Sequence, residues 1–318
     1  MQYKLNKIEL LSAVGSMFEQ SDAIVLNFQD DCICFLSMLS DGAMGLYACV
    51  KSPNITRQEV KNFKDQKRVF FTKELRQGIL ICQKASKDVS QFFIKVVPDG
   101  VILCSKQNKL TVNKTKIKCI DEEIPNYDDL VNDFGRLDDF LCLNVAAKHL
   151  SEGLSGIDSK IEDVALTIAP CKKQITRGNL LLQYRKDGVE IKHFVQLPIK
   201  TTSELATVNY EGTWAGVGLC ILKKIMDKFP MIYSKSIGGE DNDEDETKQE
   251  EHKTNKKRKT NKKEEDEEEE IVQKYNDKIQ IVLRLLPDEN TSLGIFYNLN
   301  GVIVKLYISP KQDNQTLE

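Results

Sequence analysis

The sequence predicts an α+β fold in which one strand–helix–strand–strand–strand unit occurs four times. Most apolar segments are short and alternate with period two, which is typical of half-buried strands. Between them lie four segments whose apolar residues follow helical spacing. Because one supersecondary unit recurs through 318 residues, we expect a stacked, pseudo-symmetric architecture.

The first unit shows the pattern most clearly. Ile8, Leu11, Val14 and Phe18 have the spacing of a helix over 8–19. Two short polar segments suit tight turns, namely DD at 30–31 and SDGA at 40–43. We therefore expect three strands joined by these turns, at 23–29, 32–39 and 44–51.

The other three units repeat this order, each with a strand before its helix. The second unit is expected to have a helix at 73–86 and strands at 68–72, 91–97, 100–106 and 109–119. The third is expected to have a helix at 146–154 and strands at 140–145, 164–170, 179–186 and 189–198. The fourth is expected to have a helix at 216–229 and strands at 204–211, 231–236, 278–287, 293–299 and 301–309.

A polar segment without period, IDEEIPNYDDLVND at 120–133, separates the second unit from the third. We interpret it as an interdomain connector, because such composition is typical of linkers. The expected organisation is an N-terminal domain (1–119), the connector (120–133), a C-terminal domain (134–311) and a short tail (312–318).

A run of charges interrupts the fourth unit. Between Glu240 and Glu270 there are 15 acidic and 8 basic residues, while the rest of the chain has 37 basic and 33 acidic ones. Because apolar strands follow the run, we expect a disordered insertion at 238–272 in a loop between strands. Its basic cluster has the composition of a nuclear-localisation signal, with a solubilising loop as the alternative: Lys256, Lys257, Arg258, Lys259, Lys262 and Lys263.

Several functional classes find no support in the composition. No run of 18 apolar residues exists, and the N-terminus lacks the apolar core of a signal peptide. Nine cysteines in this length fit reduced thiols better than a disulfide framework. Cys32 and Cys34 are interpreted as small core residues, and we expect no metal or other cofactor, since the three histidines show no ligand spacing.

The sequence contains little that indicates catalysis. The glycines at 212, 216 and 218 do not form a phosphate-binding loop, and the common hydrolase motifs do not occur. Acidic pairs at 30–31, 128–129 and 138–139 leave a metal-dependent nuclease open as a remote alternative. They fall in expected turns and the connector, where Asp is common, so we predict a protein that is not an enzyme.

Three stretches point to a known family. CICFLSMLSDGAMGLYACV contains a Ser37-Met38 dipeptide, IDEEIPNYDDL forms the connector, and NGVIVKLYISPK ends in Tyr307, Ile308, Ser309, Pro310 and Lys311. Together with the repeated units they resemble the eukaryotic DNA sliding clamps, whose type member is proliferating cell nuclear antigen. The resemblance implies a DNA-clamp fold of two pseudo-symmetric domains, each with two β-α-β-β-β units, in which helices line a ring and sheets lie outside.

One further stretch bears on the kind of clamp. LSEGLSGIDSKIEDVALTIAPCKK, at 150–173, resembles the Rad-one-type subunit of the checkpoint clamp, the heterotrimeric nine-one-one ring. The expected function is therefore that of a checkpoint and repair clamp, with a replicative clamp as the alternative. The implied partners are double-stranded DNA, other subunits of a trimeric ring (different ones more than identical ones), a clamp loader and clamp-binding peptides. We expect no membrane association and a nuclear location.

The resemblance also suggests two groups of binding residues. Lys73, Arg76, Lys84 and Lys87 fall within an arc of about 80° on one helix, which is equally typical of a solvated face. In a clamp this stripe would face DNA phosphates, together with Lys148, Lys223, Lys224 and Lys228. The resemblance places a partner-peptide pocket at Met38, Ile124, Tyr127, Tyr307 and Pro310, although Met38 and Tyr307 are equally suited to a strand core.

Overall fold

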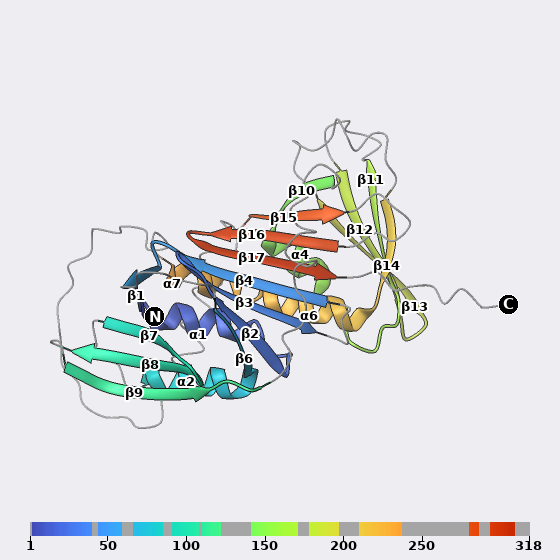
Figure 1. Ribbon diagram of the computed structural model, residues 1–318. Helices are drawn as coiled ribbons and strands as arrows, with labels where there is room; N and C mark the ends of the chain where they lie inside the picture. Colours follow the sequence, from blue (N-terminus) through green and yellow to red (C-terminus); the bar gives the residue numbers. More distant parts are fainter. Residues whose placement is uncertain are drawn as a thin grey trace, which may run out of the picture.

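The computed structural model confirms the α+β fold, and its ribbon is drawn in Figure 1. The structure describes residues 2–39, 44–58, 66–84, 91–107, 110–121, 141–170, 178–196, 210–236, 280–285 and 293–308. Most of the predicted connector, the charged insertion and the C-terminal tail lie outside the described residues. Within them, no helix is both long and apolar enough to cross a membrane.

The N-terminal half contains the first two units. The first comprises β1 (Gln2–Leu5), α1 (Ile8–Ser16), β2 (Ala23–Phe28), β3 (Cys32–Leu39), β4 (Met44–Lys51) and the short β5 (Ile55–Gln58). The second comprises β6 (Gln66–Phe71), α2 (Thr72–Lys84), β7 (Gln91–Val97), β8 (Gly100–Gln107) and β9 (Leu110–Lys118). Only β5 was not predicted from the sequence.

The C-terminal half contains the other two units. The third comprises β10 (Leu141–Ala146), α4 (Ala147–Leu154), β11 (Val164–Pro170), β12 (Gly178–Lys186) and β13 (Val189–Gln196). The fourth comprises β14 (Tyr210–Trp214), α6 (Gly216–Met226), α7 (Phe229–Lys235), β15 (Gln280–Leu285), β16 (Leu293–Leu299) and β17 (Val302–Ile308).

Each half is built by the same exchange of strands between its two units. In the N-terminal half, β1 pairs with β7 of the second unit, and β6 pairs back with β2. In the C-terminal half, β10 pairs with β15 of the fourth unit, and β14 pairs back with β11. The two halves therefore have equivalent strand pairings, as expected from the pseudo-symmetry predicted from the sequence repeat.

One sheet joins the halves. The last described strand, β17, pairs with β4 from Met44↔Ile308 to Val50↔Val302, giving an eight-stranded sheet ordered β10-β15-β16-β17-β4-β3-β2-β6. A five-stranded sheet (β5-β1-β7-β8-β9) and a four-stranded sheet (β13-β12-β11-β14) complete the two halves. The central sheet therefore depends on residues from both ends of the chain.

The helices lie on one face of these sheets. In Figure 1, α1, α6 and α4 follow one another behind the central sheet, and α2 lies against β8 and β9. Their apolar sides share one core with every second residue of the strands, such as Leu46, Val304 and Leu306. The other face of the central sheet has a small apolar cluster of its own, formed by Val25, Cys32, Cys34, Leu36, Cys49 and Val69.

One expected element of the fourth unit was wrong, and another is described only in part. Residues 231–236 were predicted to be a strand, but 231–235 belong to α7 and Ser236 caps its C-terminal end. Pro230 stands in the first turn of this helix, where its missing N–H costs nothing. The charged insertion therefore falls between a helix and β15 rather than between two strands. The strand predicted at 204–211 is seen as β14 at Tyr210–Trp214, and 201–209 lie outside the described residues.

Candidate DNA-facing and partner-binding surfaces

The predicted basic stripe lies on the side of the helices that faces away from the sheets. Lys73 and Lys84 on α2 and Lys224 on α6 are exposed, while the opposite sides of both helices are buried in the core. Arg76, Lys148, Lys223 and Lys228 are half-buried. Lys87 lies outside the described residues.

Acidic neighbours reduce the positive charge of this helix layer. Arg76 forms an ion pair with Glu19, which follows α1, at 3.5 Å. Lys223 forms one with Asp227 at 2.7 Å, and Ser151 donates a hydrogen bond to the same carboxylate at 3.0 Å. Within the described residues, the exposed lysines of α2 and α6 form no such ion pair and are the strongest candidates for phosphate contact: Lys73, Lys84 and Lys224.

A small cavity marks the place where the two halves meet in the helix layer. It encloses about 160 Å³ between the end of α1 and the end of α6. Its lining includes Glu19 and Asp227 as well as Lys224 and Lys228. The N-terminal half thus contributes one negative side chain to this junction, Glu19, whereas the C-terminal half contributes side chains of both signs.

The outer face of the central sheet brings two predicted partner-binding residues together. In the strand register, Met38 of β3 lies opposite Gly45 of β4, and Gly45 lies opposite Tyr307 of β17. Met38 is 38% exposed, an unusual fraction for a large apolar side chain within a strand. Gly45 lies between Met38 and Tyr307 and has no side chain; we call these three residues the Met38–Tyr307 row.

The other members of the predicted pocket, Ile124, Tyr127 and Pro310, lie outside the described residues. The connector nevertheless begins on this face of the sheet. Ile120 forms a bridge with Val69, and its N–H donates a hydrogen bond to the Val69 carbonyl at 2.9 Å.

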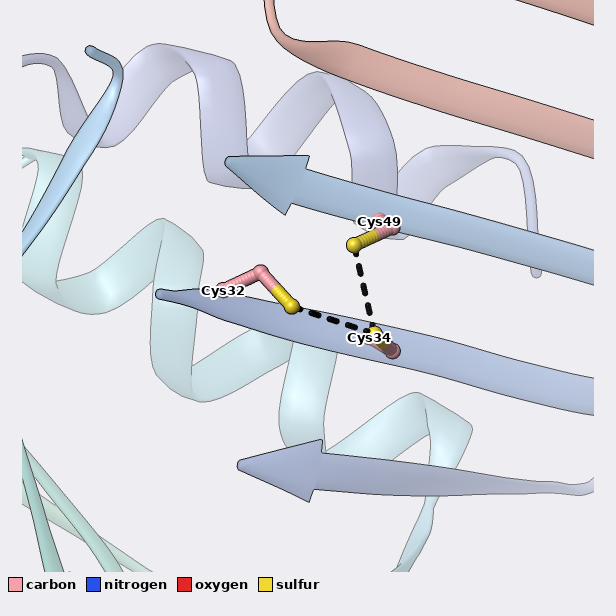
Figure 2. A group of neighbouring side chains, drawn as sticks. All are labelled: Cys32, Cys34 and Cys49. Carbon is pink, nitrogen blue, oxygen red and sulfur yellow. Dashed lines mark hydrogen bonds between the residues drawn. The ribbon is translucent and has the colours of Figure 1, made fainter. Parts of the chain in front are cut away.

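Further along the same face, three cysteines converge. Figure 2 shows Cys32 and Cys34 on one strand and Cys49 on its neighbour, with their sulfur atoms directed toward one another. The Sγ–Sγ distances are 3.2 Å for Cys34–Cys49 and 3.7 Å for Cys32–Cys34. The sequence predicted Cys32 and Cys34 as core residues, and both are buried, but Cys49 was not associated with them.

The three thiols influence one another's ionisation. Hydrogen bonds from Cys32 and Cys34 lower the pKa of Cys49 to about 4, although burial acts in the opposite direction. The hydrogen bond with Cys32 lowers the pKa of Cys34, but its hydrogen bond with Cys49 and its burial raise that pKa to about 12. Burial, followed by the charges of Cys34 and Cys49, raises the pKa of Tyr47. The hydrogen bonds among the three thiols therefore favour ionisation of one of them at the expense of the others.

Two of the edge strands in the described sheets, β9 and β13, carry side chains that bear on assembly. β9 ends the five-stranded sheet and carries exposed Lys114, Lys116 and Lys118. β13 ends the four-stranded sheet and exposes Val189 (61%) and Phe194 (68%). Unpaired strand edges are templates for pairing with another chain, and apolar side chains beside such an edge favour it.

The acidic pairs do not form a metal site among the described residues. Asp30 forms an ion pair with Arg57, and Asp31 is exposed in the turn between β2 and β3. The pairs at 128–129 and 138–139 lie outside the described residues. A nuclease centre thus finds no support in the described part of the chain.

The fold of the chain, as opposed to its sequence, resembles solved structures. No protein-family model and no curated protein matches the sequence. The fold is that of the sliding-clamp class, and the similarity extends over nearly the whole chain.

Three solved structures illustrate this similarity. PCNA from Thermococcus kodakaraensis has a TM-score of 0.59 at 10% identity, covering 98% of this chain and 99% of that one. Proliferating cellular nuclear antigen from Entamoeba histolytica has a TM-score of 0.58 at 13% sequence identity, covering 98% of each chain. A chain of the PCNA2–PCNA3 complex from Sulfolobus tokodaii has a TM-score of 0.57 at 12% sequence identity, covering 98% of this chain and 99% of that one. The predicted clamp fold is therefore confirmed.

Proposed function

We propose that this chain is a subunit of a ring-shaped DNA sliding clamp, a non-enzymatic scaffold that encircles duplex DNA and tethers other proteins to it. The observation that carries the proposal is the clamp fold over 98% of the chain, together with exposed lysines on the helix side of that fold. Phosphate attraction without base contacts is the kind of binding that a sliding protein requires.

Two edges of the described fold support assembly into a ring. A head-to-tail ring needs two different surfaces on each subunit. The edge strand β9 of the five-stranded sheet and the edge strand β13 of the four-stranded sheet can provide them. The β9 edge is basic and the β13 edge is apolar, so pairing with different subunits is favoured over pairing with identical ones. One of the similar structures is itself a complex of two different chains.

The assembly surface can be tested with Val189→Glu and Phe194→Glu combined. Both side chains are exposed, so folding should persist, whereas buried carboxylates at an interface should abolish assembly. Light scattering should show the ring of the parent chain, alone or mixed with the organism's other clamp subunits, and only single chains for the variant. Val217→Glu, at an equally apolar but helical site, is the matched control. A parent chain that assembles with no clamp subunit would contradict the proposed function.

Within this class, we propose a role in the DNA damage checkpoint and in repair. The support is the resemblance of residues 150–173 to a checkpoint subunit and the charged insertion, which a compact replicative clamp lacks. The basic cluster at 256–263 supports a nuclear location. A clamp loader and the partner enzymes belong to the same proposal, and a replicative role is the alternative.

We propose the Met38–Tyr307 row as a docking site for short peptides of partner proteins. Met38→Lys should weaken the binding of clamp-binding peptides by roughly fivefold or more, because anchors at the centre of an interface contribute more than about 1 kcal/mol each. Fluorescence anisotropy with labelled peptides provides the measurement. Val217→Lys, which replaces an exposed apolar side chain on the helix side, should leave affinity unchanged. Equal affinities for the parent chain and Met38→Lys would exclude this row as the site.

A further inference from the structure

Three thiols meet on the outer face of the central sheet and are sealed from solvent. Cys32, Cys34 and Cys49 are each no more than 1% exposed, and their sulfur atoms all lie within 4.8 Å of one another. They come from two adjacent strands, because Cys34 stands directly opposite Cys49 in the β3–β4 register (Figure 2). Sheet pairing thus fixes the positions of these thiols without help from a loop.

The sulfur positions fit a single ion. Zinc is bound tetrahedrally with Zn–S bonds of about 2.3 Å, which places two ligating sulfurs roughly 3.8 Å apart. The observed separations of 3.2 Å and 3.7 Å lie near this value. Small rotations of the side chains would therefore be enough to close three thiolates around one metal ion.

Oxygen atoms supply a fourth donor. The side-chain oxygen Oε1 of Gln29 lies 3.0 Å from the Cys32 sulfur and 3.7 Å from the Cys34 sulfur. The Tyr47 hydroxyl lies 3.2 Å from the Cys34 sulfur. Either oxygen could complete a tetrahedron, with the other as a hydrogen-bonding neighbour of the ligands.

The local charge favours a divalent ion. A complex of three thiolates has a net charge of −2 with a monovalent ion and −1 with a divalent ion. The smaller net charge costs less free energy to bury. Two cations stand near this charge: Lys51, which faces Cys32 in the register, and Lys305, whose Nζ lies 5.4 Å from the centre of the Tyr47 ring. Sulfur ligands with tetrahedral geometry select zinc among the common divalent metals.

We propose that Cys32, Cys34 and Cys49 bind one Zn²⁺ ion, with Gln29 or Tyr47 as the fourth ligand, in a closed structural site on the outer face of the central sheet. Binding forms three Zn–S bonds and releases the thiol protons to solvent, with no change of oxidation state. The ion would tie β3 to β4 beside Ile120, the first residue of the connector, which packs on this cluster.

The experiment begins with the full-length chain purified without chelators. Plasma emission spectrometry should find one zinc per chain, and Cys34→Ala and Cys49→Ala should each lose it almost completely. Cys82→Ala, which truncates an equally buried thiol on α2 outside the cluster, should retain it. Loss of a ligand should reduce the affinity for zinc by more than roughly 10- to 100-fold, which is the loss typical when a residue that hydrogen-bonds to a ligand is replaced.

A second measurement does not depend on the folding of any variant. Parent protein stripped of metal and then given Co²⁺ should develop the intense near-ultraviolet absorption of thiolate–cobalt bonds, and adding Zn²⁺ should remove it. Absence of both zinc and cobalt uptake by the parent chain would overturn the proposal. So would a purified chain whose mass is lower by two hydrogens and whose peptides show a Cys34–Cys49 disulfide.

Discussion

Lys73→Glu combined with Lys84→Glu should lower the affinity of the assembled clamp for duplex DNA by at least about 30-fold at low salt. Each change removes an attraction to a phosphate and adds a repulsion, and each of these terms is about 1 kcal/mol for charges about 4 Å apart in water. Both lysines are exposed on α2, on the side opposite its buried residues, so the substitutions should not disturb folding. Fluorescence anisotropy of a labelled duplex gives the affinities.

The salt dependence separates phosphate binding from other causes. The slope of log affinity against log salt should become shallower by about 0.9 for each phosphate that the variant no longer neutralises, and the decrease in affinity should be the same for unrelated DNA sequences. Lys4→Glu combined with Lys95→Glu is the matched control, because these side chains alternate with the buried ones of β1 and β7 and lie away from the helices. Equal effects of the two double variants would show that net charge, not the helix face, determines binding.

The structure changes which residues make the sharpest test. The sequence placed Arg76 and Lys84 in one equivalent stripe, but Arg76 is half-buried and paired with Glu19. Arg76→Glu would therefore create a repulsion with Glu19 as well as remove a cation. Lys223 is similarly paired with Asp227. Only the i, i+4 spacing of Lys223 and Asp227 could have been read from the sequence, since Glu19 meets Arg76 through packing of α1 on α2.

Local patterns predicted nearly every element because the strands are short, alternating and separated by turn residues. The failure at 231–236 has a physical cause: six residues are too few for period two to exclude a helix. The position of Pro230 just before them was the available signal for a helix start. The exchange of β1, β6, β10 and β14 between units, by contrast, depends on long-range pairing that no local pattern encodes.

The candidate sites, too, could be predicted from local patterns only in part. A turn over 40–43 pairs residues equally distant from it, so the expected hairpin already implied that Cys34 faces Cys49 and that Met38 faces Gly45. The pairing of β17 with β4, which adds Tyr307 to the row of Met38 and Gly45, could not be predicted, because the two strands are far apart in the sequence. Family resemblance assigned Met38 and Tyr307 to one pocket; in the register both lie in line with Gly45, and their role in partner binding stays a prediction.

Two glycines in α6 should respond to alanine with opposite signs. A Cβ on Gly216 would lie 2.4 Å from the carbonyl oxygen of Ile161 and 2.8 Å from that of Asp158, both of them backbone atoms. The Gly216 N–H also donates a hydrogen bond to the Ile161 carbonyl at 3.1 Å, so the helix cannot move away without breaking it. Gly216→Ala should therefore reduce the free energy of unfolding by about 2–3 kcal/mol, in the range of overpacked sites.

Gly218, two residues further along α6, has room for a methyl group. Its nearest neighbours would be Ile308 Cγ2 at 3.6 Å and Met44 Cε at 3.8 Å, which are ordinary van der Waals contacts. Gly218→Ala should increase the free energy of unfolding by up to about 1 kcal/mol, because alanine loses less backbone entropy than glycine in a helix. Thermal unfolding followed by circular dichroism should show a lower midpoint for Gly216→Ala and an equal or higher one for Gly218→Ala. The same direction of change in both variants would mean that the loop at 158–161 does not hold the start of α6 as the structure shows.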